Sequence, residues 1–489
     1  MSLASLKPEP SNISYERHRP EQTLLYKLVQ ENLLSFYAQV EKEHGSGLPD
    51  FVKKEFDEFL KCGVLAHGFL RARCDSCGHE KLVAFSCKRR GFCPSCGVRK
   101  MVETAAHLVD EVFPKKPFRQ WVITFPFQVR FLLAQDAKLM SAVLRVVNRA
   151  IESHLLKKVG FKRSDKAKTG AVTFVQRFGS SLNLNIHFHI MYLDGVYRFK
   201  ENQASFQVTR PPTQVELEKV LSNITKRVVR LLERRGLIEA DPMPEEQSGF
   251  SHIQASSITY RIALGKYKGQ KASSLKTLPE KEKTENKYLA KNSGFSLHAG
   301  IACAAHERKK LERICRYISR SSLSEERLST NKQGQVIYKL KKAYDNGTTQ
   351  IVLDPLDFLS RLASLVPKPR VNLTRFHGVF APNFKYRSLV VPKPKDKSKE
   401  ADKDKKVKDK AYALTWSQRL KRVFNIDIEK CPICETGKLK VIASIEEPRV
   451  IKKILEHIGL DSQVPSPHAA RAPPGEAEFH LAMYEENEV

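Results

Sequence analysis

The sequence is poor in acidic residues and has no long apolar run. Its 489 residues contain 54 Asp and Glu against 84 Lys and Arg, so the formal net charge is +30. No stretch approaches the ~20 apolar residues that span a bilayer, and the start, MSLASLKPEP, lacks the basic and apolar segments of an export signal. These absences argue against a membrane protein and predict a cytoplasmic one. The excess positive charge predicts nucleic acid as the partner, with an anionic membrane surface as the weaker option.

The hydrophobic content of 41% predicts a globular chain of two to four domains with a mixed α+β fold. Apolar residues recur at helical spacing in four segments: 21–62, Val98–Phe113, Phe131–Leu156 and Ala305–Arg320. Three shorter apolar segments are strand candidates: Trp121–Phe125, Ala171–Phe178 and Leu182–Leu193.

Composition also suggests where the domains divide. We expect a helical region at 1–62, a domain at 63–113 that the cysteine motifs below identify as zinc-binding, and a domain at 114–390 that the resemblance below identifies as catalytic. A linker at 391–410 and a small module at 411–489 follow. A charged insertion, Lys266–Lys291, is predicted to be a mobile loop within the catalytic domain. The linker follows from residues 393–410, which contain 14 charged side chains and cannot form a core.

Cysteines gather in two CxxC pairs, Cys74–Cys77 and Cys93–Cys96, separated by 15 residues. This spacing predicts one structural zinc site, because each CxxC turn supplies two thiolates to a tetrahedral ion. Cys87 is a fifth cysteine nearby, which either replaces one of the four or packs without metal. The later pair, Cys431 and Cys434, has no CxxC partner left; the sequence allows a site with His457 or a metal-free turn. Basic residues next to the second pair, Arg89 and Arg90 among them, suit a DNA backbone.

One strand candidate carries two histidines on the same face. In the run LNLNIHFHI over residues 182–190, the apolar residues alternate with Asn183, Asn185, His187 and His189. The two imidazoles are then about 7 Å apart and able to reach one divalent ion. Alone, such a pair is equally compatible with an ordinary polar strand face.

These motifs, taken in order, resemble the rolling-circle transposases of the insertion sequence ninety-one family and its common-region relatives, which carry a His-hydrophobe-His (HUH) core. The resemblance rests on residues 85–96, 174–196, 294–300, 311–320 and 371–382, and covers about 60–390. It implies an HUH nickase-type antiparallel sheet flanked by helices, with a zinc-ribbon-like domain before it and a small C-terminal module after it. It also implies a bacterial, nucleoid-associated enzyme that moves an insertion sequence.

The implied reaction is transesterification at a DNA phosphodiester through a 5′-phosphotyrosine. The resemblance points to Tyr317 as the catalytic nucleophile, with Arg313, Arg316 and Arg320 around it to bind DNA. Two-tyrosine members carry another Tyr where this chain has Arg313, so the chain resembles the one-tyrosine branch. The implied partner is single-stranded or hairpin DNA at transposon ends, and the oligomeric state is left open.

His187 and His189 are expected to hold a catalytic Mg²⁺ or Mn²⁺. Gln176 is the favoured third ligand, because its offset from the histidines resembles that of relaxase-type relatives and its carbonyl oxygen suits these ions. His298, His306 and Glu307 compete for this role, and Asp194 is expected to orient a histidine as a hydrogen-bond acceptor. No nucleotide cofactor is expected, since the chain lacks a P-loop sequence.

Two other functions remain as alternatives. A metal-dependent DNA hydrolase would use the same histidines with an activated water and form no covalent link. A non-catalytic regulator would bind nucleic acid through its zinc ribbon alone.

Overall fold

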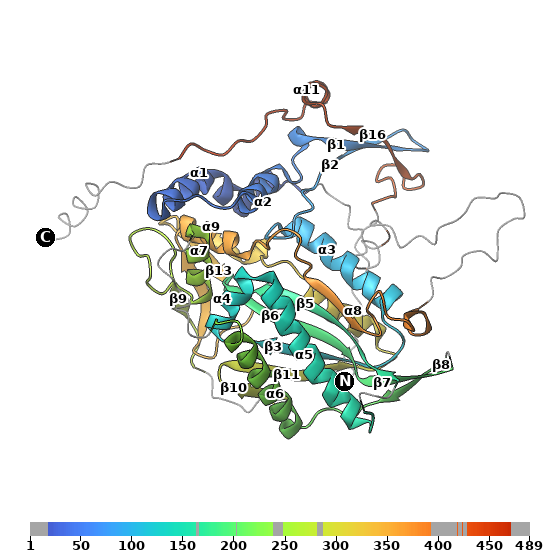
Figure 1. The fold of residues 1–489 in the computed structure, drawn as a ribbon. Helices are drawn as coiled ribbons and strands as arrows, with labels where there is room; N and C mark the ends of the chain where they lie inside the picture. The colour runs from blue at the N-terminus through green and yellow to red at the C-terminus, as the bar shows by residue number, and fades with distance from the viewer. Residues whose placement is uncertain are drawn as a thin grey trace, which may run out of the picture.

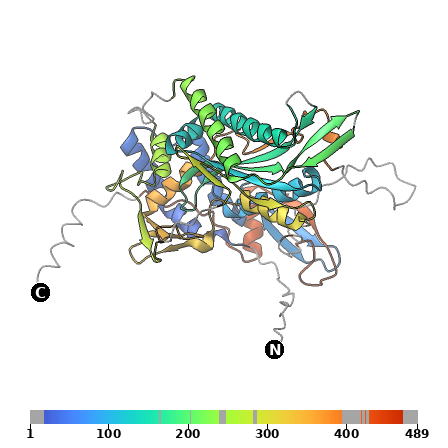
Figure 2. The ribbon, with the colours of Figure 1, turned by 90° about the horizontal axis from the view of Figure 1, so that it is seen from below.

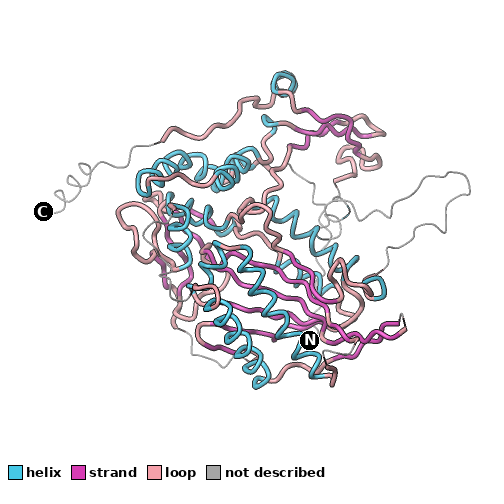
Figure 3. The backbone as a smooth tube through the Cα atoms, in the orientation of Figure 1, coloured by secondary structure: helices cyan, strands magenta, loops and turns pink. Residues whose placement is uncertain are grey.

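The computed structural model describes residues 18–162, 166–201, 203–237, 248–280, 287–392, 418, 423 and 428–470. It confirms the mixed α+β class, with antiparallel sheets and helices throughout (Figure 3). Of the predicted linker at 391–410, residues 393–410 lie outside the described residues. Among the described helices, none is long and apolar enough to cross a membrane.

A six-stranded antiparallel sheet forms the centre of the molecule (Figure 1). Its strand order is β10–β11–β3–β6–β5–β15, so the histidine strand β6 lies between β3 and β5. The strands span Leu289–Asn292 (β10), Phe295–Cys303 (β11), Phe118–Thr124 (β3), Leu184–Leu193 (β6), Gly170–Phe178 (β5) and Thr374–Gly378 (β15).

Helices cover both faces of this sheet (Figure 2). On one face, α5 (Ala137–Lys158) and α6 (Gln214–Glu233) bury the even-numbered side chains of β6, from Leu184 to Ile190. On the other face, α3 (Pro94–His107), a π-helical turn (Leu108–Val112) and α8 (Arg308–Ile318) pack over Met191 and Leu193. The odd-numbered histidines of β6 therefore face α3 and α8.

The N-terminal helices α1 (Leu24–His44) and α2 (Asp50–Lys61) share a second core with α7 (Gly249–Ile258) and α9 (Pro355–Leu365). A four-stranded sheet joins this core in the order β12–β13–β14–β9. Its strands are Leu328–Thr330 (β12), Val336–Lys339 (β13), Thr348–Leu353 (β14) and Ser273–Lys276 (β9). A smaller sheet contains Ala167–Lys168 (β4), Gly195–Lys200 (β7) and Gln203–Val208 (β8).

A third region combines the two ends of the chain. The strands β1 (Phe69–Cys74) and β2 (Glu80–Ala84) form a sheet with β16 (Leu439–Ile445), and α11 (Pro448–His457) packs beside it (Figure 1). Here a C-terminal segment becomes part of an N-terminal module, an association that was not predicted from the sequence.

Three elements differ from the prediction. The helix expected over Phe131–Leu156 is two helices, α4 (Phe127–Gln135) and α5, because Asp136 is extended and its carboxylate accepts the Lys138 N–H at 2.6 Å as an N-cap. The strand begins at Leu184 and not at Leu182, whose φ of 59° turns it into the N-terminal core. The insertion predicted as a mobile loop contains β9 and the start of β10, which pair with β14 and β11.

Candidate active site and cysteine clusters

His187 and His189 lie side by side on the α3–α8 face of the central sheet. Their ring centroids are 4.8 Å apart, and the residues are only 9% and 7% exposed. Burial lowers the pKa of His187 to about 4 and the pKa of His189 well below its usual value, so both rings are neutral near pH 7. A neutral imidazole is the form that binds a metal ion.

Gln176, the residue predicted as the third ligand, lies next to this pair. The register of β5 and β6 places it opposite His187, and its Oε1 lies 2.9 Å from Nε2 of His189. His298 lies on β11, separated from β6 by β3, and the Glu307 carboxylate accepts the Ala304 N–H and pairs with Lys310. Of these candidates, Gln176 is the one that contacts a histidine of the pair.

Gln120 on β3 also contacts this cluster, and it was not predicted from the sequence as a site residue. Its Nε2 lies 2.7 Å from Nδ1 of His189, while its Oε1 is buried without a hydrogen-bond partner. Turning the amide over places Oε1 where it accepts the Nδ1–H and leaves Nε2 of His189 free to face an ion. His187 donates its Nδ1–H to the Asn185 carbonyl at 2.8 Å, which also leaves its Nε2 available. The cluster thus fits two imidazole ligands and one amide oxygen.

Tyr317 lies near the C-terminal end of α8 and is 45% exposed. The guanidinium of Arg320 stacks 4.3 Å from its ring centroid, and the Lys341 ammonium lies 4.8 Å from the same ring. The predicted apolar stripe of this helix is confirmed, since Leu311, Cys315 and Ile318 are buried and Ile314 packs beside them.

Two contacts connect the tyrosine helix to the histidine cluster. The Gln176 Nε2 donates to the Ile318 carbonyl at 3.4 Å, directly after Tyr317. Arg320 also stacks on Phe178 of β5, and its charge is among the causes that lower the pKa values of both histidines. The end of α8, with Tyr317 and Arg320, therefore packs against the part of β5 that carries Gln176.

A basic cavity of about 270 Å³ opens beside this site, between α3, β5 and the segment after α8. Its lining includes Gln176 and contains no acidic residue. Five basic residues line it: Arg89, Arg90, Lys100, Arg177 and Arg320. Gly97 allows the close approach of α3 here, because a Cβ atom would lie 2.7 Å from that of Ser321. Arg313 is exposed on α8, and Arg316 has a buried Nε without a hydrogen-bond partner.

Asp194 does not orient a histidine, which corrects the prediction. Its carboxylate pairs with Arg119 at 2.8 and 3.1 Å and accepts from the Thr209 hydroxyl at 3.4 Å. Asp194 lies five residues beyond His189, and a strand advances about 3.3 Å per residue, so its carboxylate is too distant from the imidazoles.

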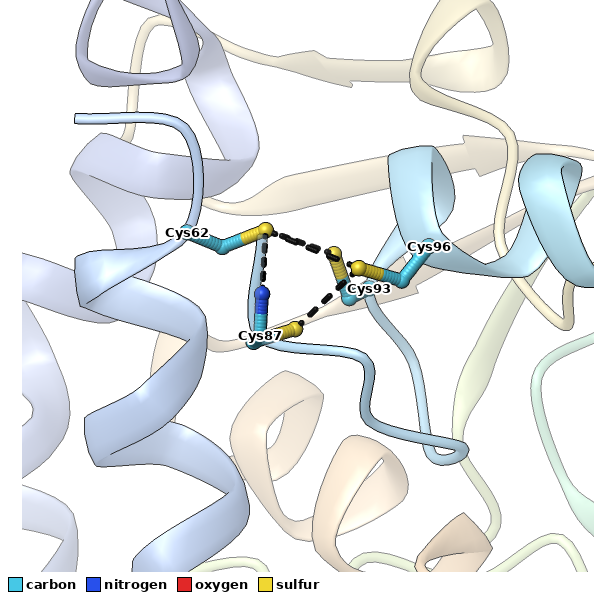
Figure 4. Close-up of side chains that lie close together, drawn as sticks. All are labelled: Cys62, Cys87, Cys93 and Cys96. Atoms are coloured by element: carbon cyan, nitrogen blue, oxygen red, sulfur yellow. Dashed lines mark hydrogen bonds between the residues drawn. The ribbon is translucent and has the colours of Figure 1, made fainter. Parts of the chain in front are cut away.

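The cysteines form two clusters and not the single predicted one. Cys93 and Cys96 gather with Cys62 and Cys87 (Figure 4), whereas Cys74 and Cys77 gather with Cys431 and Cys434. The spacing rule paired the nearest CxxC motifs, but β1 and β2 separate them in space. His457 belongs to neither set.

The first cluster ties three segments together. Cys62 follows α2, Cys87 lies in the loop after β2, and Cys93 and Cys96 flank the start of α3. The recorded sulfur separations are 3.7 Å for Cys62–Cys96 and Cys62–Cys93, and 3.4 Å for Cys87–Cys96. Four thiolates on a Zn²⁺ with 2.3 Å bonds lie about 3.8 Å apart, so this set fits a closed structural zinc site. The nearness of Cys87 to the second CxxC pair was the sequence signal for its role, whereas Cys62 was missed.

Two family models match the chain. Residues 32–125 match a model described as "Transposase zinc-binding domain", which includes all four cysteines of the first cluster, and residues 170–387 match one described as "Putative transposase". No curated protein and no solved structure matches the chain. The second match contains both histidines, Gln176 and Tyr317. The order of a zinc-binding domain and a transposase domain makes this chain a DNA-processing protein of the insertion sequence ninety-one-like transposases.

Proposed function

We propose that this transposase cuts and rejoins single-stranded DNA with Tyr317 as its nucleophile, and moves an insertion sequence by a rolling-circle-like route. The observation that carries the proposal is Arg320, which stacks on the Tyr317 ring and also on Phe178 of β5, two residues beyond Gln176. A phosphate held by this guanidinium would lie beside the Tyr317 ring and in the cavity that Gln176 also lines.

The reaction exchanges one phosphoester for another. The Tyr317 oxygen attacks the scissile phosphorus and loses its proton to solvent, which reaches this exposed side chain. The bond from phosphorus to the 3′-oxygen breaks, the 3′-oxygen takes up a proton, and the 5′-phosphate stays on Tyr317. A 3′-hydroxyl then attacks the phosphotyrosine and releases the phenol, so the strand is rejoined without a nucleotide cofactor. The assignment to the one-tyrosine branch rests on Arg313, which stands where two-tyrosine members carry their other tyrosine.

His187, His189 and Gln176 would hold Mg²⁺ or Mn²⁺, which supplies charge stabilisation to the phosphate and the leaving oxygen. The three side chains would bind through Nε2, Nε2 and Oε1, and Gln120 would fix the orientation of His189. Their buried position keeps the imidazoles neutral and excludes most water from this side of the phosphate.

The basic cavity supports a path for the DNA strand. It extends from Gln176 and Arg320 to Arg89, Arg90 and Lys100 of the zinc-binding region, and its lining includes the buried Arg177, whose pKa burial lowers to about 10. Arg177 therefore remains charged at neutral pH. Unpaired strands or hairpins suit a cavity of this size better than continuous duplex.

A metal-dependent hydrolase is the second candidate, favoured by the same histidine cluster. The two mechanisms differ in what stays on the protein. The hydrolase would release both DNA fragments, whereas the tyrosine mechanism retains the downstream fragment.

The test incubates the protein and Mn²⁺ with single strands from the element's ends, labelled at either terminus, and separates products on a denaturing protein gel. We expect label from the downstream fragment on the protein, and Tyr317→Phe should reduce this adduct about 1000-fold or more. Tyr267→Phe is the matched control, because Tyr267 is also 45% exposed and lies away from the site.

His187→Ala should also abolish the adduct, with partial recovery at high Mn²⁺ that Tyr317→Phe never shows. Cleavage without an adduct would favour the hydrolase, and intact DNA in every reaction would favour a non-catalytic regulator. An undiminished adduct in Tyr317→Phe would show that another tyrosine is the nucleophile.

A further inference from the structure

The second cysteine cluster joins two parts of the chain more than 350 residues apart. Cys74 and Cys77 flank the turn between β1 and β2, and Cys431 and Cys434 lie in the turn before β16. The Cys74 and Cys434 sulfurs are 3.7 Å apart, those of Cys77 and Cys431 are 3.6 Å apart, and all four lie within 4.8 Å of one another. All four are free thiols, and neither family match extends to residues 431–434.

This geometry is that of a mononuclear tetrahedral site. The recorded separations match the about 3.8 Å expected between thiolates on one zinc ion, and they are far too long for a disulfide of about 2 Å. Backbone N–H groups also point at the sulfurs: Ser76 N–H donates to Cys74 Sγ at 3.4 Å, and Gly437 N–H donates to Cys434 Sγ at 3.3 Å. Such donors stabilise thiolate ligands.

The surrounding backbone holds the two cysteine pairs together. Strands β1 and β16 pair antiparallel from Phe69↔Ile445 to Cys74↔Leu439. Beyond the last pair, the Asp75 carboxylate accepts the Lys438 N–H at 2.8 Å and lies 3.2 Å from the Lys440 ammonium. A Cβ on Gly437 would lie 2.3 Å from Cys74 Sγ, so glycine is required for the turns to approach this closely.

Apolar packing in this module is small. Its buried core consists of Leu65, Phe69, Ile451 and Leu455. So few apolar residues rarely hold a module together, and modules of this size usually need a metal or disulfides.

We propose that Cys74, Cys77, Cys431 and Cys434 bind a second structural Zn²⁺, which fastens the C-terminal segment 428–457 to the N-terminal zinc-binding region. The ion links residues 74–77 to residues 431–434 and is independent of the first cluster. The inference does not rest on the tyrosine mechanism, because metal content and chain association are measured without DNA cleavage.

The first test counts metal in the unaltered, reduced full-length protein by native mass spectrometry and elemental analysis. We expect two zinc ions per chain, and one in a Cys431→Ser/Cys434→Ser variant. Cys303→Ser is the matched control, since Cys303 is a buried cysteine outside both clusters, and it should keep two. One zinc in the unaltered protein, or iron in place of the second zinc, overturns the proposal even where the double variant fails to fold.

The second test asks whether the ion fastens the two ends. A specific protease site is inserted within residues 393–410, and the protein is cleaved under native conditions and passed over a sizing column. We expect the C-terminal fragment to co-elute with the remainder of the unaltered protein and to separate in the double variant. A fragment that co-elutes in both shows that strand pairing alone holds it and overturns the fastening role.

Discussion

Single residues decide whether the histidine cluster can bind an ion. His189 presents Nε2 to Gln176 and Nδ1 to Gln120, so the orientation of one amide sets which ring nitrogen carries the proton. The unpartnered Gln120 Oε1 is the acceptor that the metal-binding tautomer needs. We therefore propose Gln120 for the orienting role that was first predicted for Asp194.

Replacing Gln120 should therefore raise the Mn²⁺ concentration that cleavage requires and should change the activity at saturating Mn²⁺ very little. In Gln120→Ala, we expect the Mn²⁺ concentration for half-maximal cleavage to rise about 10- to 100-fold, with nearly full activity at saturation. Gln207→Ala, at an exposed position on β8, should leave the titration unchanged. A Gln120→Ala protein with an unaltered Mn²⁺ dependence would exclude this orienting role.

Asp194 should matter for stability and not for metal binding. Its ion pair with Arg119 joins side chains only 10% and 6% exposed, so Asp194→Asn leaves a buried guanidinium without its counter-charge. We expect the free energy of unfolding to fall by about 3 kcal/mol in denaturant titrations, while Mn²⁺ affinity stays within twofold. Unchanged stability together with weaker Mn²⁺ binding would support the role first predicted for Asp194, the orientation of a histidine.

At the scale of elements, strong periodicity was a good guide. The strands β3, β5 and β6 and the helices α1, α2, α3 and α8 all fall where apolar spacing predicts them. The break between α4 and α5 could not be predicted from the sequence, because the apolar pattern continues across Asp136. Only the N-cap at Asp136 separates the two helices. The strand β9 was hidden for a different reason: its side chains are exposed, and backbone pairing with β14 alone defines it.

The cysteine clusters could not be assigned from spacing. A zinc site of this kind needs four sulfur atoms close together in space. A CxxC motif predicts that its own two sulfurs are close, but not which other cysteines lie near them. Cys62 and Cys87 belong to no CxxC motif, and the partners of Cys74 and Cys77 lie beyond residue 430. Gln176, in contrast, was proposed from the resemblance to relaxase-type relatives, and the register of β5 and β6 places it opposite His187.

The first cluster connects α2, the loop after β2 and α3, so its metal should stabilise the wall of the basic cavity. In Cys87→Ser we expect one fewer zinc per chain, a Tm lower by several degrees and weaker DNA binding. Cys303→Ser should retain the zinc content and DNA affinity. If Cys87→Ser kept its full zinc content, Cys87 would not be a ligand. The set predicted from spacing, in which Cys74 and Cys77 bind the ion with Cys93 and Cys96, would then be favoured.

Across the whole molecule, positive charge is concentrated by the fold as well as by composition. The net charge of +30 attracts any polyanion, but the cavity beside Tyr317 brings five basic residues together without an acidic one. The zinc-binding region supplies Arg89, Arg90 and Lys100, and the sheet and the segment after α8 supply Arg177 and Arg320. The two family-matched domains therefore meet at one basic surface.

Binding to single strands should weaken steeply with salt, because neutralised phosphates release counterions on association. Each phosphate contact contributes about −0.7 to the slope of log affinity against log salt. Lys100→Gln removes one cavity charge, so we expect a slope shallower by roughly that amount and a uniform loss of affinity across sequences. Lys200→Gln is the control, since its side chain is 81% exposed at the β7–β8 turn and lies outside the cavity. Fluorescence anisotropy with a labelled oligonucleotide over a salt series measures both slopes. Equal slopes for the two variants would mean that the strand does not pass through the cavity and is bound by charge spread over the surface.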